Sequence, residues 1–145
     1  MVDIARSALV GHSADSMYAL VEDIESYPQF LPWCERAVVL AREPGRTVAT
    51  LHLNVRGLRQ SFTTKNANTP GSHIEMKLVS GPFRRLDGQW SFTDLGVRAS
   101  KVELSLHYEL GNDLMGKAFG AAFQGIADRL VDAFVRRAEE KFRQA

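Results

Sequence analysis

The residues that could carry out acid–base, metal or thiol chemistry are few and scattered. The four histidines are His12, His52, His73 and His107, and no two of them have the spacing of a metal-ligand pair. His52 and His107 fall between apolar residues of alternating segments, which points both side chains to solvent. Cys34, the only cysteine, has no CxxC partner and is expected to be a buried structural thiol. The sequence therefore predicts neither a metal site nor a catalytic histidine.

Motifs of the common catalytic and nucleotide-binding classes are absent from the sequence. It contains no GxGxxG, no phosphate-binding GxxxxGKS/T, no GxSxG and no HExxH pattern. The neighbouring carboxylates Glu139 and Glu140 lie among alternating charges typical of a solvated helix face. Since no acid–base pair suited to catalysis can be assigned, we expect the protein not to be an enzyme.

A few polar residues fall at positions whose neighbours on the same face are apolar. Gln60 and Thr64 share the face of Phe62, and Arg6 shares the face of Ile4. An arginine is seldom buried alone, so Arg6 is expected at the edge of a sheet or paired with a carboxylate. The alternative is that Arg6, Gln60 and Thr64 orient the polar head of a ligand inside an otherwise apolar pocket.

Length and composition describe an ordinary globular protein. The 145 residues are enough for one domain with a real core, and we expect a single domain over residues 1–145. Hydrophobic residues make up 45% and charged residues 24%, with a formal net charge of +1, so composition gives no reason to expect DNA binding. One cysteine excludes an intramolecular disulfide, and neither a secretory signal nor a membrane span is recognisable. A cytoplasmic location is expected.

Hydrophobic periodicity predicts how the first three quarters of the chain are organised. Val2–Val10 is typical of a strand, and Ser13 is expected to cap a helix that Tyr27–Pro28 interrupts. From about residue 36 to residue 110, short alternating segments are separated by turn residues, which predicts an antiparallel meander. At Asp87–Gly88 the chain forms either a hairpin turn or a β-bulge, and we favour the bulge.

A long helix is expected to follow Asn112 or Asp113. About 30 helical residues would span roughly 45 Å, and they carry one apolar stripe made of Met115, Phe119, Ala122, Phe123, Ile126, Leu130, Phe134 and Ala138. A strand, an interrupted helix, a meander of about six strands and this helix predict an α+β fold.

Three glycines in the first half of that helix need an explanation. Gly116, Gly120 and Gly125 each cost up to about 1 kcal/mol relative to alanine. One interpretation is close packing of the helix backbone against the sheet. The other is that small residues thin the wall of a cavity, and that cavity would be lined by Met115, Phe119 and Phe123.

Three stretches of the chain carry a resemblance to a known family. They are YPQFLPWC (residues 27–34), GPFRRLDGQWSF (residues 81–92) and the AFGAAF and RLVDAFVRRAEEKF segments of the last helix. Together they resemble the coenzyme Q-binding START-like family within the polyketide cyclase/dehydrase superfamily, over essentially the whole chain. The resemblance implies a helix-grip (START/Bet v 1-like) fold, in which a curved antiparallel sheet of six to seven strands wraps around the long C-terminal helix and leaves an apolar tunnel.

The resemblance also implies ligand contacts, and we assign them to residues of this chain by inference. The expected ligand-binding residues are Tyr27, Phe30, Leu31, Trp33, Phe62, Phe83, Trp90, Phe92, Met115, Phe119, Phe123 and Ile126. Pro28 is expected to end the first helix, and Pro32 to keep the following turn extended. Held between them, Tyr27, Phe30 and Leu31 would face the ligand as a lid, the membrane as a tip, or the core. Serine at positions 30 and 31 is expected to weaken lipid retention more than folding stability.

Three functions are compatible with the sequence. By the resemblance, the protein is a chaperone that binds ubiquinone or another prenyl lipid in support of respiration, with no cofactor besides that ligand, at or near the bacterial inner membrane. The alternative is a toxin-like protein that binds the large ribosomal subunit, with contacts from Arg56, Arg59, Arg84, Arg85, Arg136, Arg137, Lys141 and Arg143. Solvated strand ends and a charged helix end explain the same basic residues. A cyclase- or dehydratase-like enzyme is the third and least favoured reading.

Overall fold

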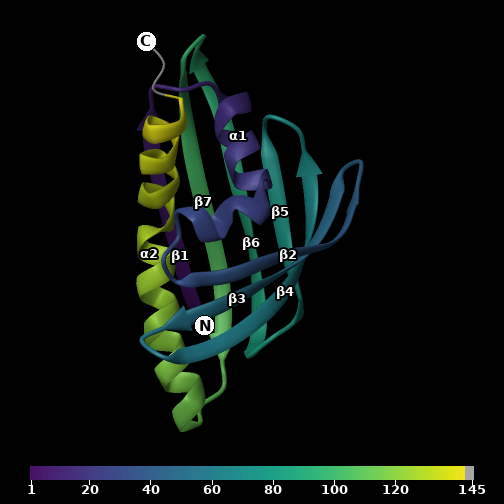
Figure 1. Ribbon diagram of the computed structural model, residues 1–145, viewed down its shortest axis with the longest axis vertical. Helices are drawn as coiled ribbons and strands as arrows, with labels where there is room; N and C mark the ends of the chain where they lie inside the picture. The colour runs from purple at the N-terminus through teal and green to yellow at the C-terminus, as the bar shows by residue number, and fades with distance from the viewer. Residues whose placement is uncertain (143–145) are drawn as a thin grey trace.

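A seven-stranded antiparallel sheet and one long helix make up most of the protein (Figure 1). The computed structural model describes residues 1–142 of the chain. In chain order, the elements are β1 (Val2–Val10), α1 (Ala14–Glu22), the 3-10 helix η1 (Ile24–Gln29), β2 (Cys34–Glu43), β3 (Arg46–Val55), β4 (Leu58–Thr69), β5 (His73–Ser80), β6 (Phe83–Gly96), β7 (Ala99–Leu110) and α2 (Leu114–Lys141).

The strand order is β1-β7-β6-β5-β4-β3-β2, and all neighbouring strands are antiparallel. Strands β2 to β7 therefore form a continuous meander, and β1 is added beside β7. Figure 1 shows β6, β7 and β1 running along α2, whereas β2, β3 and β4 cross the helix direction. The sheet thus curves around one face of α2, which confirms the predicted α+β helix-grip fold.

The first helix ends earlier than the sequence predicted. Ser13 is its N-cap as expected, because the Ser13 hydroxyl accepts a hydrogen bond from the Ser16 N–H at 3.2 Å. The helix stops at Glu22, however, and Pro28 lies inside η1. The interpretation of Pro28 as the residue that ends the first helix is wrong. The chain has already left the α-helical conformation at Asp23, where φ is −81° and ψ is 67°.

Strand β6 is irregular at two places, and neither is the predicted one. Its pairing with β7 is regular through Asp87 and Gly88, and the register shifts instead between Phe83 and Arg85 and between Asp94 and Gly96. Neither a turn nor a bulge exists at Asp87–Gly88. A Cβ atom on Gly88 would lie 2.5 Å from the Ser105 carbonyl oxygen, so close approach of β7 accounts for this glycine.

The last helix begins and packs largely as predicted. The Asp113 carboxylate accepts a hydrogen bond from the Gly116 N–H at 2.8 Å and caps α2. Its buried face consists of Phe119, Phe123, Ile126, Ala127, Val131, Phe134 and Ala138. Met115, the first residue of the predicted stripe, is 52% exposed. Figure 1 shows the reason, because the first turn of α2 extends beyond the ends of the neighbouring strands.

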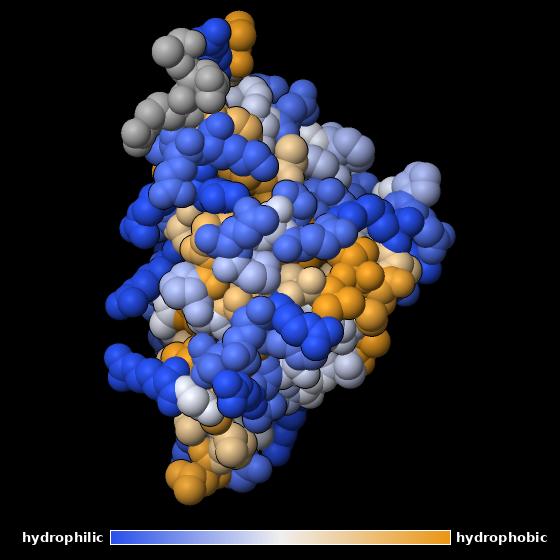
Figure 2. Space-filling view, viewed as in Figure 1, coloured by the Kyte–Doolittle hydropathy of each residue, from blue (hydrophilic) through white to orange (hydrophobic). Residues whose placement is uncertain are grey.

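Exposed apolar atoms mark that end of the molecule in Figure 2. Leu114 is 85% exposed and stands beside Met115 at the start of α2. Among residues 1–142, no helix is both long and apolar enough to cross a lipid bilayer.

Candidate ligand-binding cavity

An apolar cavity of about 90 Å³ lies between the sheet and α2. Strands β3 to β7 form one wall, and α2 forms the opposite wall with Phe123, Ile126, Ala127, Leu130 and Phe134. The wall at the N-terminal side comes from Ile24 and Tyr27 of η1 and from Trp33 in the turn before β2. The cavity occupies the position expected for the tunnel, but it is narrow.

Seven of the predicted site residues meet at this cavity, six of the twelve ligand-binding residues and one residue of the polar head site. They are Tyr27, Trp33, Phe62, Thr64, Trp90, Phe123 and Ile126. These residues come from η1, the following turn, β4, β6 and α2, so the fold brings together positions that are up to about a hundred residues apart in the sequence. The other predicted residues lie elsewhere, and their positions fall into three groups.

The first group belongs to the Tyr27–Cys34 segment, which is part of the core. Leu31 is completely buried, and the Tyr27 hydroxyl donates a hydrogen bond to the Val21 carbonyl oxygen. Phe30 is half-buried and packs edge-to-face on Phe134, with 5.2 Å between ring centroids. A lid or membrane-touching tip made of these residues is therefore wrong. The segment contributes only Tyr27 and Trp33 to the cavity wall.

Cys34, at the end of this segment, is buried as predicted. Its Sγ lies 3.5 Å from the Arg36 carbonyl oxygen, to which the thiol donates. Burial raises the pKa of the Cys34 thiol to about 11. The thiol is therefore protonated near neutral pH, which agrees with a structural role.

The second group is an aromatic layer beside the cavity. Phe83 packs against Phe119 and Phe123 with centroid distances of 5.5 and 4.9 Å, and Phe92 stacks on Trp90 at 6.2 Å. Phe83, Phe119 and Phe92 therefore support the lining residues rather than line the cavity themselves. Met115 is outside the cavity and borders a surface hollow with Gly81 and Pro82.

The glycines of α2 do not thin the wall of this cavity. A Cβ atom on Gly116 would lie 2.3 Å from the Gly111 carbonyl oxygen, and one on Gly120 would lie 3.0 Å from the Leu110 side chain. Close packing explains these two positions. Gly125 is exposed with open space around it, and nothing in the structure explains that glycine.

The third group is the predicted polar head site, of which only Thr64 lines the cavity. Arg6 lies on the edge strand β1 and forms an ion pair with Asp128 of α2, so it has both the edge position and the carboxylate partner expected of an arginine without a ligand role. Gln60 is half-buried and is not part of the lining. Asn66 was not predicted, but it is 6% exposed, lines the cavity and accepts a hydrogen bond from the Thr64 hydroxyl at 3.0 Å. The alternation that puts residues 60, 62 and 64 on one face of the strand also puts residue 66 there, so strand parity could have identified Asn66.

The basic residues proposed for the ribosome come from separate parts of the fold. Arg59 pairs with Glu35 at 3.1 Å, and Arg84 approaches Glu109 at 3.8 Å. Arg137 donates to Gln29 at 2.8 Å and lies 5.0 Å above the Phe30 ring. Arg56 is in the β3–β4 turn with a φ of 53°, Arg136 and Lys141 are near the end of α2, and Arg143 is outside the described residues.

Within residues 1–142, no three His, Cys, Asp or Glu side chains could together hold a metal ion.

The sheet wrapped around α2 and the apolar cavity between them define a START-like helix-grip fold, and sequence comparison identifies the family. Residues 10–135 match the family described as polyketide cyclase/dehydrase and lipid transport, so the chain belongs to that family. It is 43% identical over 142 residues to the ribosome association toxin RatA of Escherichia coli, covering 98% of this chain and 90% of the relative. It is 24% identical over 140 residues to the mitochondrial coenzyme Q-binding protein coq10 of Schizosaccharomyces pombe, covering 93% and 85%. A START superfamily protein from Mycobacterium smegmatis has the same fold, with a TM-score of 0.81, 23% identity and coverage of 95% and 97%.

Proposed function

We propose that the protein binds a prenyl quinone such as ubiquinone, or a related prenyl lipid, between the sheet and α2. The cavity supports this proposal, since its walls are mostly aliphatic and aromatic with one hydrogen-bonded polar pair, Thr64 and Asn66. Because the Thr64 hydroxyl donates to the Asn66 carbonyl oxygen, the amide NH₂ group of Asn66 is available to donate to a quinone carbonyl. The name of the coq10 relative points to the same ligand class.

The size of the cavity sets a condition on binding. Pockets for drug-sized ligands usually measure about 300–1,000 Å³, whereas this cavity measures about 90 Å³. Side chains must therefore move when a prenyl lipid enters. Trp33, Leu51, Met76 and Leu130 line the cavity and are only half-buried, so they can change rotamer with less disturbance than the buried lining residues.

We assign carriage or protection of the lipid rather than catalysis. Tyr27 and Asp87 are the titratable residues of the lining. The Tyr27 hydroxyl already donates to a backbone carbonyl, and burial raises its pKa, so it is a poor acid or base at neutral pH. Asp87 alternates with inward-facing Leu86 and Gly88, which places its carboxylate on the outer face of the sheet. We therefore propose that the protein acts as a quinone chaperone in respiration. A cyclase or dehydratase activity is the disfavoured alternative.

Extraction of the native ligand tests the proposal. Protein purified from its natural host is extracted with organic solvent, and the extract is analysed by mass spectrometry beside an extract of an unrelated protein prepared in the same way. We expect a prenyl quinone or prenyl lipid to be enriched, and added ubiquinone to raise the Tm of the protein. If the extract contains no such lipid and ubiquinone does not change the Tm, the proposal is wrong.

We propose ribosome binding as a second function, because relatives that are 40–43% identical over nearly the whole chain are named ribosome association toxins. The partner would be the large subunit, as the family resemblance implies. Arg136 and Lys141 on α2 are the simplest candidates for contacts with rRNA phosphates, since no ion pair within residues 1–142 engages either of them.

Sedimentation with purified large subunits tests this second function. We expect the protein to move with the subunit in a sucrose gradient at low salt and to be released as salt is raised. Replacing Arg136 and Lys141 by glutamine should reduce the bound fraction, while the same change at Lys101 on β7 serves as the control. Failure of the wild-type protein to move with the subunit at any salt concentration would remove this function and leave quinone binding untouched.

A further inference from the structure

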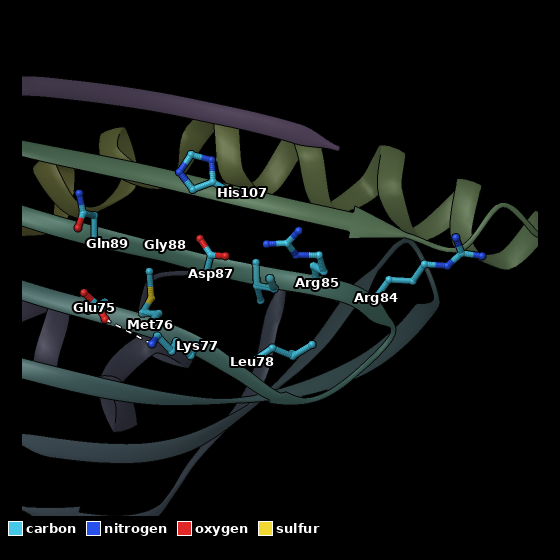
Figure 3. Close-up of a pocket in the computed structure, with 11 residues that line it drawn as sticks. Glu75, Met76, Lys77, Leu78, Arg84, Arg85, Asp87, Gly88, Gln89 and His107 are labelled. Carbon is cyan, nitrogen blue, oxygen red and sulfur yellow. Dashed lines mark ion pairs between the residues drawn. The ribbon is translucent and has the colours of Figure 1, made fainter.

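The two strands β5 and β6 separate before their hairpin closes. Their pairing runs from His73 opposite Ser91 to Lys77 opposite Asp87 and then stops. Strand β5 remains paired with β4 through Ser80, and β6 remains paired with β7 from Phe83 onward. The sheet is therefore continuous on both sides of a gap in its hydrogen-bond ladder. Figure 3 shows the two strands diverging along this part of the sheet.

A cleft of about 490 Å³ lies where the strands separate (Figure 3). Polar side chains from β5, β6 and β7 surround it, namely Glu75, Lys77, Arg84, Arg85, Asp87 and His107. Met76, Leu86 and Asp87 line both this cleft and the inner cavity. The hollow on the outer face of the sheet and the cavity on its inner face therefore meet at these three residues.

The inner side of this meeting point is the polar part of the cavity. Asn66 is the register partner of Met76, and Thr64 is the partner of Leu78. The hydrogen-bonded pair of Thr64 and Asn66 thus stands one strand away from the cleft. A second hollow that shares residues with the cavity, on the side of α1 and η1, measures only about 20 Å³. The β5–β6 cleft is much the wider of these two approaches.

The side chain between the cleft and the cavity is suited to move. Met76 is half-buried and unbranched, and methionine side chains adapt their shape at little cost. On the outer rim, Lys77 is 3.9 Å from Glu75, and Arg84 is 3.8 Å from Glu109. Arg85 has no ion-pair partner within residues 1–142, so its guanidinium can bind oxygen acceptors of a ligand.

We propose that an amphiphile enters the inner cavity through the β5–β6 cleft and keeps its head there, between Asn66 on the inner side and Arg85 on the outer rim. Its apolar chain lies inside, against Phe123 and Ile126 of α2. The head carries oxygen acceptors at one end of the chain, a chemistry that a quinone ring shares with a carboxylate. This inference rests on the proposed lipid-binding function and adds to it the direction of the ligand and its route.

Photochemical labelling locates the head directly. Two probes are used with the full chain, a twelve-carbon fatty acid with a diazirine beside its carboxylate and a short-chain ubiquinone with a diazirine on its ring. We expect both to label residues 75–78 or 84–89, as identified by mass spectrometry of peptides, with competition by unlabelled ligand. Labels on residues 24–33 or 115–119 would overturn the route. If neither probe gives labelling that unlabelled ligand competes away, lipid binding itself is overturned, and the route with it.

A charge reversal on the rim separates the two head chemistries. We compare the wild-type protein with Arg85→Glu and with Arg98→Glu, which makes the same charge change at an exposed position near the other end of β6. We expect Arg85→Glu to raise the Kd for dodecanoate about tenfold or more. For decylubiquinone, which is neutral, we expect a rise of roughly threefold from the lost donors. Arg98→Glu should leave both values unchanged.

The outcomes of this comparison are distinct. Weaker binding of both probes supports an oxygen-acceptor head at Arg85, and weaker binding of dodecanoate alone supports a carboxylate head. Equal Kd values for all three proteins would overturn the placement of the head at the cleft while leaving the proposed lipid binding in place.

Discussion

The two sides of the cavity differ in how they are built. On the side of η1, the rings of Tyr27 and Phe30 pack edge-to-face on Phe134, and Trp90 packs on the same ring from the sheet, with centroid distances of 5.2–5.3 Å. On the side of β5 and β6, the ladder stops after Lys77 and charged groups surround the opening. The apolar loop that looked like a lid is thus part of the packed wall, whereas the more polar strands border the cleft through which we propose that the ligand enters. Apolar composition in a loop therefore does not by itself identify ligand contact.

The largest expected effect comes from removing the ring at the centre of the closed side. Phe134 is 1% exposed and contacts three aromatic rings, so we expect Phe134→Ala to lower the free energy of unfolding by about 3–5 kcal/mol. Urea unfolding measures this value. Leu114→Ala, at a position 85% exposed on the same helix, should change it by less than about 0.5 kcal/mol. Similar losses in both variants would show that the aromatic wall is not the main support of this side.

Leu31 tests whether the Tyr27–Cys34 segment is wall or lid. The residue is fully buried and does not line the cavity, so we expect Leu31→Ala to cost about 2–4 kcal/mol of stability while the Kd for quinone stays nearly constant below the unfolding transition. This reverses the expectation from sequence, in which changes at this segment weaken lipid retention more than folding. Leu40→Ala, at a position 60% exposed on β2, is the matched control for stability. If Leu31→Ala instead lost much of its quinone affinity and kept normal stability, the interpretation of the segment as a lid would be supported.

The polar pair beside the open side should influence binding more than folding. Replacing both members together, as Thr64→Val with Asn66→Leu, removes their hydrogen bond without leaving a single buried partner unpaired. We expect stability to change by less than about 1 kcal/mol. The Kd for quinone should rise about two- to tenfold, since one hydrogen bond to the head is lost. Calorimetric titration measures the affinity, and an unchanged Kd would show that the ligand's head does not reach Asn66.

The smallest effect concerns the reactivity of Cys34. With a pKa raised to about 11 by burial, only about a thousandth of the thiol is ionised at pH 8. We expect alkylation of the folded protein to be slow at pH 8 and to accelerate toward pH 11. Since the pKa is higher in the folded state than in the unfolded state, stability should decline from about pH 8.5 upward through this range. Rapid alkylation of the native protein at pH 8 would mean that the closed side opens frequently.

Local patterns predicted most of the elements and the start of each helix, but not the end of the first helix. The strand Val2–Val10 and the cap Ser13 depend on alternation or on one side chain near its own backbone, and the structure has them where the sequence placed them. For the last helix the sequence offered Asn112 or Asp113 as the cap, and the structure has Asp113. Gly88 could not be interpreted in the same way. Its requirement comes from the Ser105 carbonyl on β7, which only the folded sheet brings close.

The site was predictable where strand parity or a shared helix face determines which side a residue faces. Phe62, Thr64 and Trp90 on the sheet, and Phe123 and Ile126 on α2, line the cavity as parity and helical spacing suggested. Parity does not reveal where an element ends relative to its neighbours, which is why Met115 is outside. The β5–β6 cleft forms because, beyond Lys77, β5 pairs only with β4 and β6 pairs only with β7. No local pattern in either strand contains that information.

Quenching of tryptophan fluorescence tests the central claim most directly. The chain has two tryptophans, Trp33 and Trp90, and both line the cavity. A quinone ring that binds there should quench both, so Trp33→Phe and Trp90→Phe each retain one reporter on the wall. We predict saturable quenching by decylubiquinone in both single-tryptophan proteins, with the same Kd and one ligand per chain. No saturable quenching in the wild-type protein, or none in either variant, would contradict binding of a quinone between the sheet and α2.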